Sequence, residues 1–169
     1  MPGLFEFYDL YELFFDIFYN HNEFFYDWCD IGSVYGAPAD CLWGGGRVGF
    51  GEYEPVKVRA LLEKYKIPAR LTFSNSLLEE KHFSDKRCNE LCKIFENERN
   101  GIIIYSDQLM DYIKEYYPLY HFISTTTKVI TDFDEFKAEL KREDYKFVVP
   151  DFRLNKSFER LSELDEKMK

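Results

Sequence analysis

The segment Gly44-Gly45-Gly46-Arg47 combines residue types that bind anions in many proteins. Three glycines leave their backbone N–H groups accessible, and the guanidinium of Arg47 can pair with a phosphate or a carboxylate. The segment lacks the Lys-Ser/Thr ending of a P-loop and does not match the GxGxxG fingerprint. It predicts a ligand-binding loop, with a glycine-rich loop that only makes tight turns as the alternative.

Two aspartates follow predicted strands at positions where a carboxylate could take part in catalysis. Asp30 lies at the end of the first predicted strand, and Asp151 lies near the end of the fifth. Such a carboxylate can act as a general acid, a general base or a metal ligand. Carboxylates after strands also cap the helices that follow them, which is the alternative. Asp30 and Asp151 are the candidate catalytic residues.

Polar residues after the other strands indicate where an anionic ligand would be held. Lys128 and Arg153 follow the fourth and fifth predicted strands, and Asn75 follows the second. The cations could lower the pKa values of the aspartates or bind a negatively charged molecule. The predicted ligand-binding residues are Gly44, Gly45, Gly46, Arg47, Asn75, Lys128 and Arg153.

The spacing of cysteines and histidines predicts no metal site. Cys88 and Cys92 are four residues apart and would share one face of a helix, but a structural zinc site needs four ligands. Cys29 and Cys41 are expected in a strand and a loop, away from that helix. Buried, reduced thiols are the better interpretation, and the pattern identifies no cofactor.

Charge and hydropathy exclude several classes of partner. With 31 acidic and 22 basic residues the net charge is −9, which repels nucleic acid and anionic membranes at long range. Glu6, Asp9, Glu12 and Asp16 interrupt the most hydrophobic stretch, so no transmembrane helix is predicted. The first residues do not resemble a secretory signal, and free cysteines suit the cytosol. We therefore expect a cytoplasmic protein that binds neither nucleic acid nor membrane.

Strand and helix patterns alternate along the chain, after an amphipathic helix predicted at residues 4–19. Short apolar or β-branched runs predict strands at residues 26–33, 70–73, 102–105, 122–126 and 147–149. Capping residues predict helices that begin at Pro55, Ser84, Ser106 or Asp107, Thr131 and about Ser157.

This alternation predicts an α/β fold with a parallel sheet, in one domain of 169 residues. We expect a partial (β/α)8 barrel of about five units, with an open five-stranded parallel sheet as the alternative. The length favours the open sheet, because a complete barrel needs about 250 residues. Polar residues after nearly every strand favour the barrel, in which they would converge on one mouth.

Several motifs resemble those of uncharacterised bacterial TIM-barrel-like proteins, which are distantly similar in layout to the collagenase-like peptidase family. The motifs are Asp30-Ile31-Gly32-Ser33, Tyr35-Gly36-Ala37-Pro38, Trp43-Gly44-Gly45-Gly46-Arg47, Thr72-Phe73-Ser74-Asn75 and Ser124-Thr125-Thr126. The resemblance implies that the chain is the N-terminal part of a longer barrel, although no strand is predicted before its first helix. It carries over no catalytic residue.

The sequence leaves two classes of function open. The first is a barrel-type protein that binds or acts on a small anionic molecule at the C-terminal ends of its strands. The second is a noncatalytic module that forms homodimers through exposed strand edges. A membrane-surface role of the first helix is a weaker third hypothesis.

Overall fold

The computed structural model describes residues 1–45 and 54–164. Over these residues the chain forms an α/β fold with an open, five-stranded, all-parallel sheet and six α-helices. The strands are β1 (Val34–Gly36), β2 (Ala69–Phe73), β3 (Gly101–Ile104), β4 (His121–Ser124) and β5 (Tyr145–Val148). The helices are α1 (Tyr8–Asn20), α2 (Pro55–Lys64), α3 (Lys86–Phe95), α4 (Asp107–Tyr116), α5 (Phe133–Leu140) and α6 (Phe158–Ser162).

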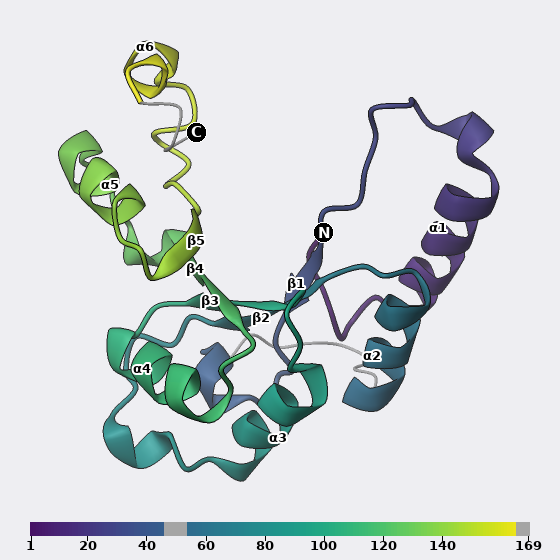
Figure 1. The fold of residues 1–169 in the computed structure, drawn as a ribbon, viewed down its shortest axis with the longest axis horizontal. Coiled ribbons are helices and arrows are strands. Elements are labelled where there is room, and N and C mark those ends of the chain that lie inside the picture. The colour runs from purple at the N-terminus through teal and green to yellow at the C-terminus, as the bar shows by residue number, and fades with distance from the viewer. Residues whose placement is uncertain (46–53, 165–169) are drawn as a thin grey trace.

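The sheet has the sequential strand order β1-β2-β3-β4-β5, and every neighbouring pair is parallel. This order confirms the open parallel sheet, the second of the two expected architectures. It lacks the reversal of a doubly wound sheet and corresponds to a run of neighbouring strands in a barrel wall. Figure 1 shows α2, α3 and α4 grouped on one face of the sheet, which leaves the other face, called the inner face below, without them.

The N-terminal residues lie along the edge of β1. Pro2 forms a parallel bridge with Tyr35, the Tyr35 N–H donates to the Met1 carbonyl at 2.9 Å, and the Leu4 N–H donates to the Tyr35 carbonyl at 3.2 Å. This pairing is an isolated bridge, and no strand precedes α1 among the described residues, as the sequence predicted. The helix itself begins at Tyr8, because residues 1–4 are occupied in this pairing.

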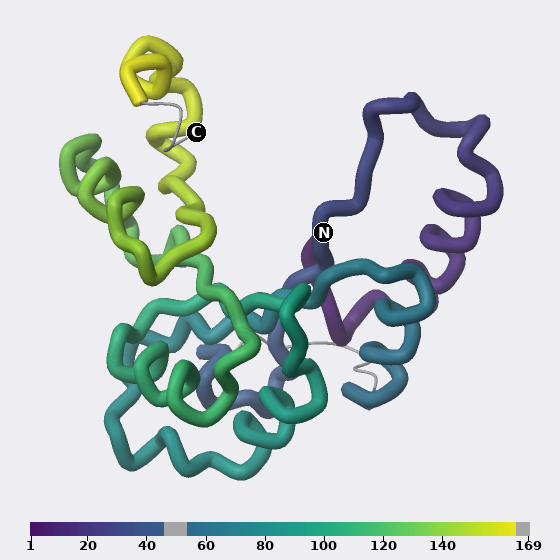
Figure 2. The backbone as a smooth tube through the Cα atoms, viewed as in Figure 1, coloured from purple at the N-terminus to yellow at the C-terminus, as the bar shows by residue number. Residues whose placement is uncertain are grey.

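The strand predicted at residues 26–33 is wrong, because the first strand of the sheet begins at Val34. Trp28 is 81% exposed and stacks on Tyr26, which is exposed as well. The aromatic residues that suggested a buried strand instead belong to a long connection from α1 to β1, which Figure 2 traces away from the sheet.

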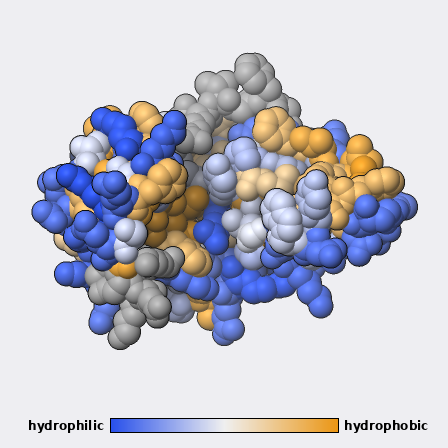
Figure 3. All heavy atoms as spheres, turned by 90° about the horizontal axis from the view of Figure 1, so that it is seen from above, coloured by the Kyte–Doolittle hydropathy of each residue, from blue (hydrophilic) through white to orange (hydrophobic). Residues whose placement is uncertain are grey.

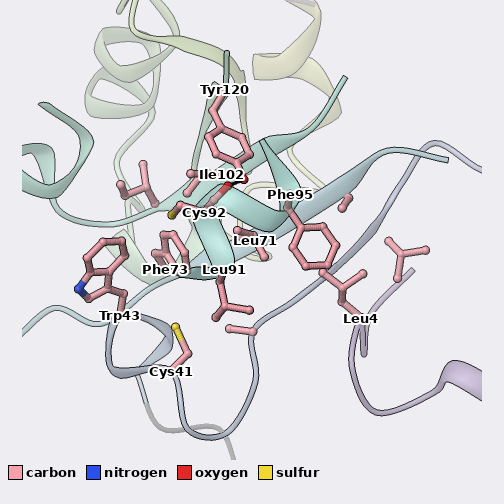
Figure 4. Close-up of a cluster of buried hydrophobic side chains, with 14 of the residues drawn as sticks. Leu4, Cys41, Trp43, Leu71, Phe73, Leu91, Cys92, Phe95, Ile102 and Tyr120 are labelled. Carbon is pink, nitrogen blue, oxygen red and sulfur yellow. Dashed lines mark hydrogen bonds between the residues drawn. The ribbon is translucent and has the colours of Figure 1, made fainter. Parts of the chain in front are cut away.

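The main core lies between the sheet and α3 and α4. Leu71, Phe73 and Ile102 point away from the inner face and pack with Leu91 and Phe95 of α3 (Figure 4). Alternation along each strand places these side chains on the helix-covered face and their neighbours on the inner face. The strands thus divide their residues between a core and a surface that can hold a ligand.

Candidate functional site

The inner face of the sheet holds a cavity of about 770 Å³, within the size range of small-molecule sites. Strands β1 to β4 line its floor, α1 and the connection to β1 line one side, and residues 125–127 line another. Figure 3 looks toward this face and shows a hollow between the part of the molecule that contains α1 and the part that contains α5.

Alternate residues of the strands form the floor of the cavity in successive layers. The strand register pairs Tyr35 with Arg70 in one layer and Thr72 with Ile103 in the next, where Ile103 also pairs with Ile123. Because paired residues of parallel strands point to the same face, a guanidinium, a hydroxyl and aliphatic groups come together here. The floor is mixed, with polar groups on β2 and apolar groups on β3 and β4.

Aromatic rings from α1 and the following connection make an apolar side wall. Phe14 and Phe18 lie one helical turn apart on α1, and both contact Phe25 with ring centroids 5.9 and 4.8 Å away. All three line the cavity. The wide apolar arc of this helix is thus divided between the core, which takes Tyr11 and Phe15, and the cavity.

Arg70 is the cation of the cavity floor. Its guanidinium carbon lies 4.9 Å from the ring centroid of Phe147 on β5, and burial lowers its pKa. In the described part of the chain no carboxylate pairs with Arg70, and its buried Nε has no hydrogen-bond partner. Arg70 is half-buried, and a partly desolvated charge without a counter-ion is unfavourable, so this position is suited to an anion.

Hydroxyl groups continue from Arg70 toward the C-terminal ends of the strands. Thr72 is 6% exposed, and its Oγ1 has no hydrogen-bond partner among the described residues. Beyond it the Ser74 and Thr125 hydroxyls lie 3.4 Å apart, and Thr125 lies 3.1 Å from the Thr127 hydroxyl. Thr72 therefore offers an unused donor and acceptor to a ligand in the cavity.

His121 lies beside Arg70 at the N-terminal end of the inner face. Its ring fits against Gly101, where an added Cβ would lie 2.6 Å from the His121 Nε2. Burial, Lys146 and Arg70 lower the pKa of His121 to about 4, and neither ring nitrogen has a partner among the described residues. The imidazole is therefore neutral near pH 7.

Acidification should reduce stability through His121. Its pKa is about 4 in the folded protein and 6.5 when unperturbed, so between these values the unfolded chain binds more protons. The free energy of unfolding is therefore unaffected by His121 above pH 6.5, and it decreases as the pH falls toward 4. Because the ring is only partly buried, we expect a loss of stability of about 1 kcal/mol.

Urea unfolding at about pH 7 and about pH 4.5 should show a smaller loss of stability in His121→Gln than in the wild type. The exposed His21→Gln is the control, and equal losses in all three proteins would contradict the expectation.

Among the predicted site residues, Asp30 lines the cavity, where it is exposed at the rim and its carboxylate accepts the Ile31 N–H at 2.7 Å. Gly46 and Arg47 lie outside the described residues. Gly44 and Gly45 are away from the cavity, where the Gly44 N–H donates to the Cys41 carbonyl. These two glycines therefore pack within a turn and do not bind a ligand in the cavity.

Asn75 holds that same turn against the end of β2. Its Nδ2 donates to the Leu42 carbonyl at 2.9 Å, and its backbone N–H donates to the Trp43 carbonyl. Gly45 has a φ of +82°, and an added Cβ there would lie 3.3 Å from the Asn75 backbone. Asn75 joins two segments of the fold and does not line the cavity.

The other predicted polar residues have protein partners outside the cavity. The buried Asp151 carboxylate accepts two hydrogen bonds from the Arg153 guanidinium, at 2.7 and 3.1 Å, which lowers the pKa of Asp151. Lys128 donates to Glu139 at 2.7 Å and to the Tyr145 hydroxyl at 2.8 Å. The structure thus brings neither Asp151 nor these two cations to Asp30.

Arg70 is the residue that sequence reasoning missed. It lies inside a strand, whereas the sequence pattern pointed to residues that follow strands. A lone cation within the apolar run Ala69–Phe73 was the available signal, since a charge there must face a polar or open surface. In contrast, the sequence led us to expect that hydroxyls after different strands come together, and those of Ser74 and Thr125 do so.

No three His, Cys, Asp or Glu side chains in residues 1–45 and 54–164 are placed to hold a metal ion. None of the helices described is long and apolar enough to cross a membrane. Comparisons with protein-family models, curated proteins and solved structures found no match to this chain.

Proposed function

We propose that this protein binds a small apolar compound with a single carboxylate, in the cavity on the inner face of its sheet. The observation that carries the proposal is Arg70, a cation on the floor of an otherwise largely apolar cavity that no carboxylate of the described residues neutralises.

A ligand carboxylate would supply what Arg70 lacks. A guanidinium binds a carboxylate through two parallel hydrogen bonds, and the unpartnered Nε of Arg70 is a ready donor for one of them. The Thr72 hydroxyl, in the next layer of the floor, is available for a further hydrogen bond. Ligand binding would thus satisfy polar groups that are buried without partners.

The charges around the cavity favour a monoanion over a dianion. Asp30 lines the same cavity, and the chain as a whole carries a net charge of −9. A second negative charge on the ligand would face Asp30, and the Met1 ammonium on the cavity wall already donates to the Ser33 carbonyl at 2.8 Å. A phosphate monoester is therefore a poorer fit than a carboxylate.

The remaining walls suit an apolar body. The cavity is lined by the aromatic rings of Phe14, Phe18 and Phe25 and by the aliphatic side chains of Ile103 and Ile123. Burial of an aromatic or branched group here would gain about 25 cal/mol per Å² of apolar surface removed from water.

The described hydroxyls of the cavity support binding and not nucleophilic catalysis. Thr125 contacts Ser74 and Thr127, and no described carboxylate or imidazole accepts a hydrogen bond from any of these three hydroxyls. A serine or threonine nucleophile needs such a base. Ser124 does contact Glu139, but Ser124 is on the face away from the cavity.

The test is calorimetric titration with aryl and branched-chain carboxylates, led by phenylacetate, with phenylacetamide as the uncharged match and phenyl phosphate as the dianion. We expect phenylacetate to bind most tightly of these three. Arg70→Ala should weaken its binding about tenfold to a hundredfold, since a hydrogen bond to a charged group contributes about 1.5–3 kcal/mol.

Arg70→Lys should retain only part of the affinity. It keeps the positive charge, but an ammonium group cannot form the bidentate pair of hydrogen bonds. Arg59→Ala, which removes an exposed guanidinium on α2, is the matched control and should bind as the wild type does. Loss of binding in Arg153→Ala with full binding in Arg70→Ala would place the anion at the cations first expected from the sequence. Absence of binding across the panel would refute the proposal.

A second candidate function is self-assembly through β5, which pairs only with β4 among the described strands. Its free edge has unpaired backbone groups, and Phe147 and Val149 nearby are exposed. Sedimentation equilibrium tests this candidate, because assembly would give a molar mass that rises with protein concentration.

A further inference from the structure

Three buried cysteines meet beneath the sheet, on the side opposite the cavity. Cys41 precedes a short 3-10 helix, η2 (Leu42–Gly44), while Cys88 and Cys92 lie one turn apart on α3. Cys41 is 2% exposed, and both α3 cysteines are fully buried. Figure 4 shows Cys41 and Cys92 among the core side chains, near Trp43 and Leu91.

The Sγ atoms of Cys41 and Cys88 are 3.4 Å apart. A disulfide has an S–S bond of about 2.05 Å, so the sulfur atoms need to approach by only about 1.4 Å. We propose that Cys41 and Cys88 form a reversible disulfide when the protein meets a two-electron oxidant such as hydrogen peroxide. This site is independent of the ligand-binding function proposed above.

The surroundings of the pair assign different roles to the two sulfur atoms. The contact with the Cys88 thiol and the backbone N–H groups of Gly44 and Trp43 lower the pKa of Cys41, against the effect of burial. The same contact with Cys41, together with burial, raises the pKa of Cys88. Cys41 is therefore the sulfur that reaches the thiolate state more easily and attacks the oxidant first.

The reaction balances with peroxide as the only oxidant. The Cys41 thiolate attacks one peroxide oxygen, the O–O bond breaks, and the departing hydroxide takes a proton to give water and a Cys41 sulfenic acid. The Cys88 sulfur then attacks the Cys41 sulfur, the S–O bond breaks, and a second water leaves. The two thiols lose two electrons and two protons, and peroxide is reduced to two molecules of water.

Formation of this bond would join two parts of the chain that are 47 positions apart. It would fix η2 against α3, and the large closed loop would restrict the unfolded chain. We therefore expect the oxidised protein to unfold at a higher urea concentration than the reduced one, and reduction with dithiothreitol to reverse the shift.

The experiment uses the full chain with Cys29→Ser, because Cys29 is partly exposed and could form intermolecular disulfides. The protein is treated with hydrogen peroxide under native conditions and analysed by non-reducing mass spectrometry. We expect the mass to fall by two hydrogen atoms, two of the three thiols to disappear, and peptide mapping to join Cys41 to Cys88.

Three further variants in that background identify the partners. Cys92→Ser should still form the bond and is the matched control, since Cys92 is equally buried on the same helix. Cys88→Ser should lose it and leave a Cys41 sulfenic acid that dimedone traps. Cys41→Ser should yield neither product.

Each contrary result overturns the proposal. Three intact thiols after peroxide treatment would show that the pair does not oxidise. A bond from Cys41 to Cys92, or addition of oxygen atoms without a cross-link, would show that the short Sγ–Sγ distance does not direct the chemistry.

Discussion

Replacement of Trp43 by alanine should destabilise the protein by about 3–5 kcal/mol, the range for loss of a large aromatic side chain from a core. Trp43 is fully buried and contacts the rings of Phe73 and Tyr112 edge-on, with centroids 5.2 and 6.0 Å away. Its Nε1 donates to the His82 carbonyl at 2.9 Å, so the change also removes a hydrogen bond. Urea unfolding followed by circular dichroism measures the loss.

The second tryptophan supplies the matched control. Trp28 is 81% exposed, so Trp28→Ala should change the free energy of unfolding by no more than about 0.5 kcal/mol. Trp43→Phe should lie between the two, because it keeps an aromatic ring and loses the hydrogen bond to His82. If Trp43→Ala were no more destabilising than Trp28→Ala, the result would contradict the packing of η2 against α4.

Replacement of Asn100 by alanine should cost about 2–4 kcal/mol of stability, which is unusually large for a polar residue in a connection. Asn100 is 6% exposed and precedes β3. Its Oδ1 accepts the Ala69 N–H of β2 at 2.8 Å, and its Nδ2 donates to the Phe95 carbonyl of α3 at 2.7 Å. The change leaves two buried backbone groups unsatisfied, at about 1–3 kcal/mol each.

Two variants show whether those hydrogen bonds are the cause. Asn100→Asp keeps the size but cannot donate to the Phe95 carbonyl, so it should be at least as destabilised as Asn100→Ala at neutral pH. Asn155→Ala, at an exposed position, should be nearly neutral. The urea midpoint reports the change, and the slope of the transition should stay constant. A loss below about 0.5 kcal/mol in Asn100→Ala would contradict this role.

The burial of Trp43 gives the described part of the glycine segment a different role from the one its composition suggested. Trp43 and Gly44 occupy the core, where a Cβ on Gly44 would come within 2.8 Å of the Ala37 side chain. Glycine is needed here because the turn packs closely on the sheet. The proposed anion site is instead at Arg70, which lies in a strand and has the same guanidinium chemistry as Arg47.

The sequence by itself determined the features that depend on near neighbours along the chain. Pro55 begins α2, and the Ser106 side chain caps α4 by accepting the Leu109 N–H. The caps expected at Ser84 and Thr131 fall one residue later, at Asp85 and Asp132, because a carboxylate competes for the same backbone donors. Alternation of strand and helix then predicts a parallel sheet, since right-handed crossovers return each strand in the same direction.

Only the tertiary structure decided which residues share a site. The register of β2 against its neighbours turns Arg70 and Thr72 toward the inner face, and a shift of one residue would have buried both in the core. The pairing of Cys41 with Cys88 likewise depends on how the segment after β1 folds back onto α3. Strand faces and loop contacts are set by the packing of distant segments, which local sequence patterns do not encode.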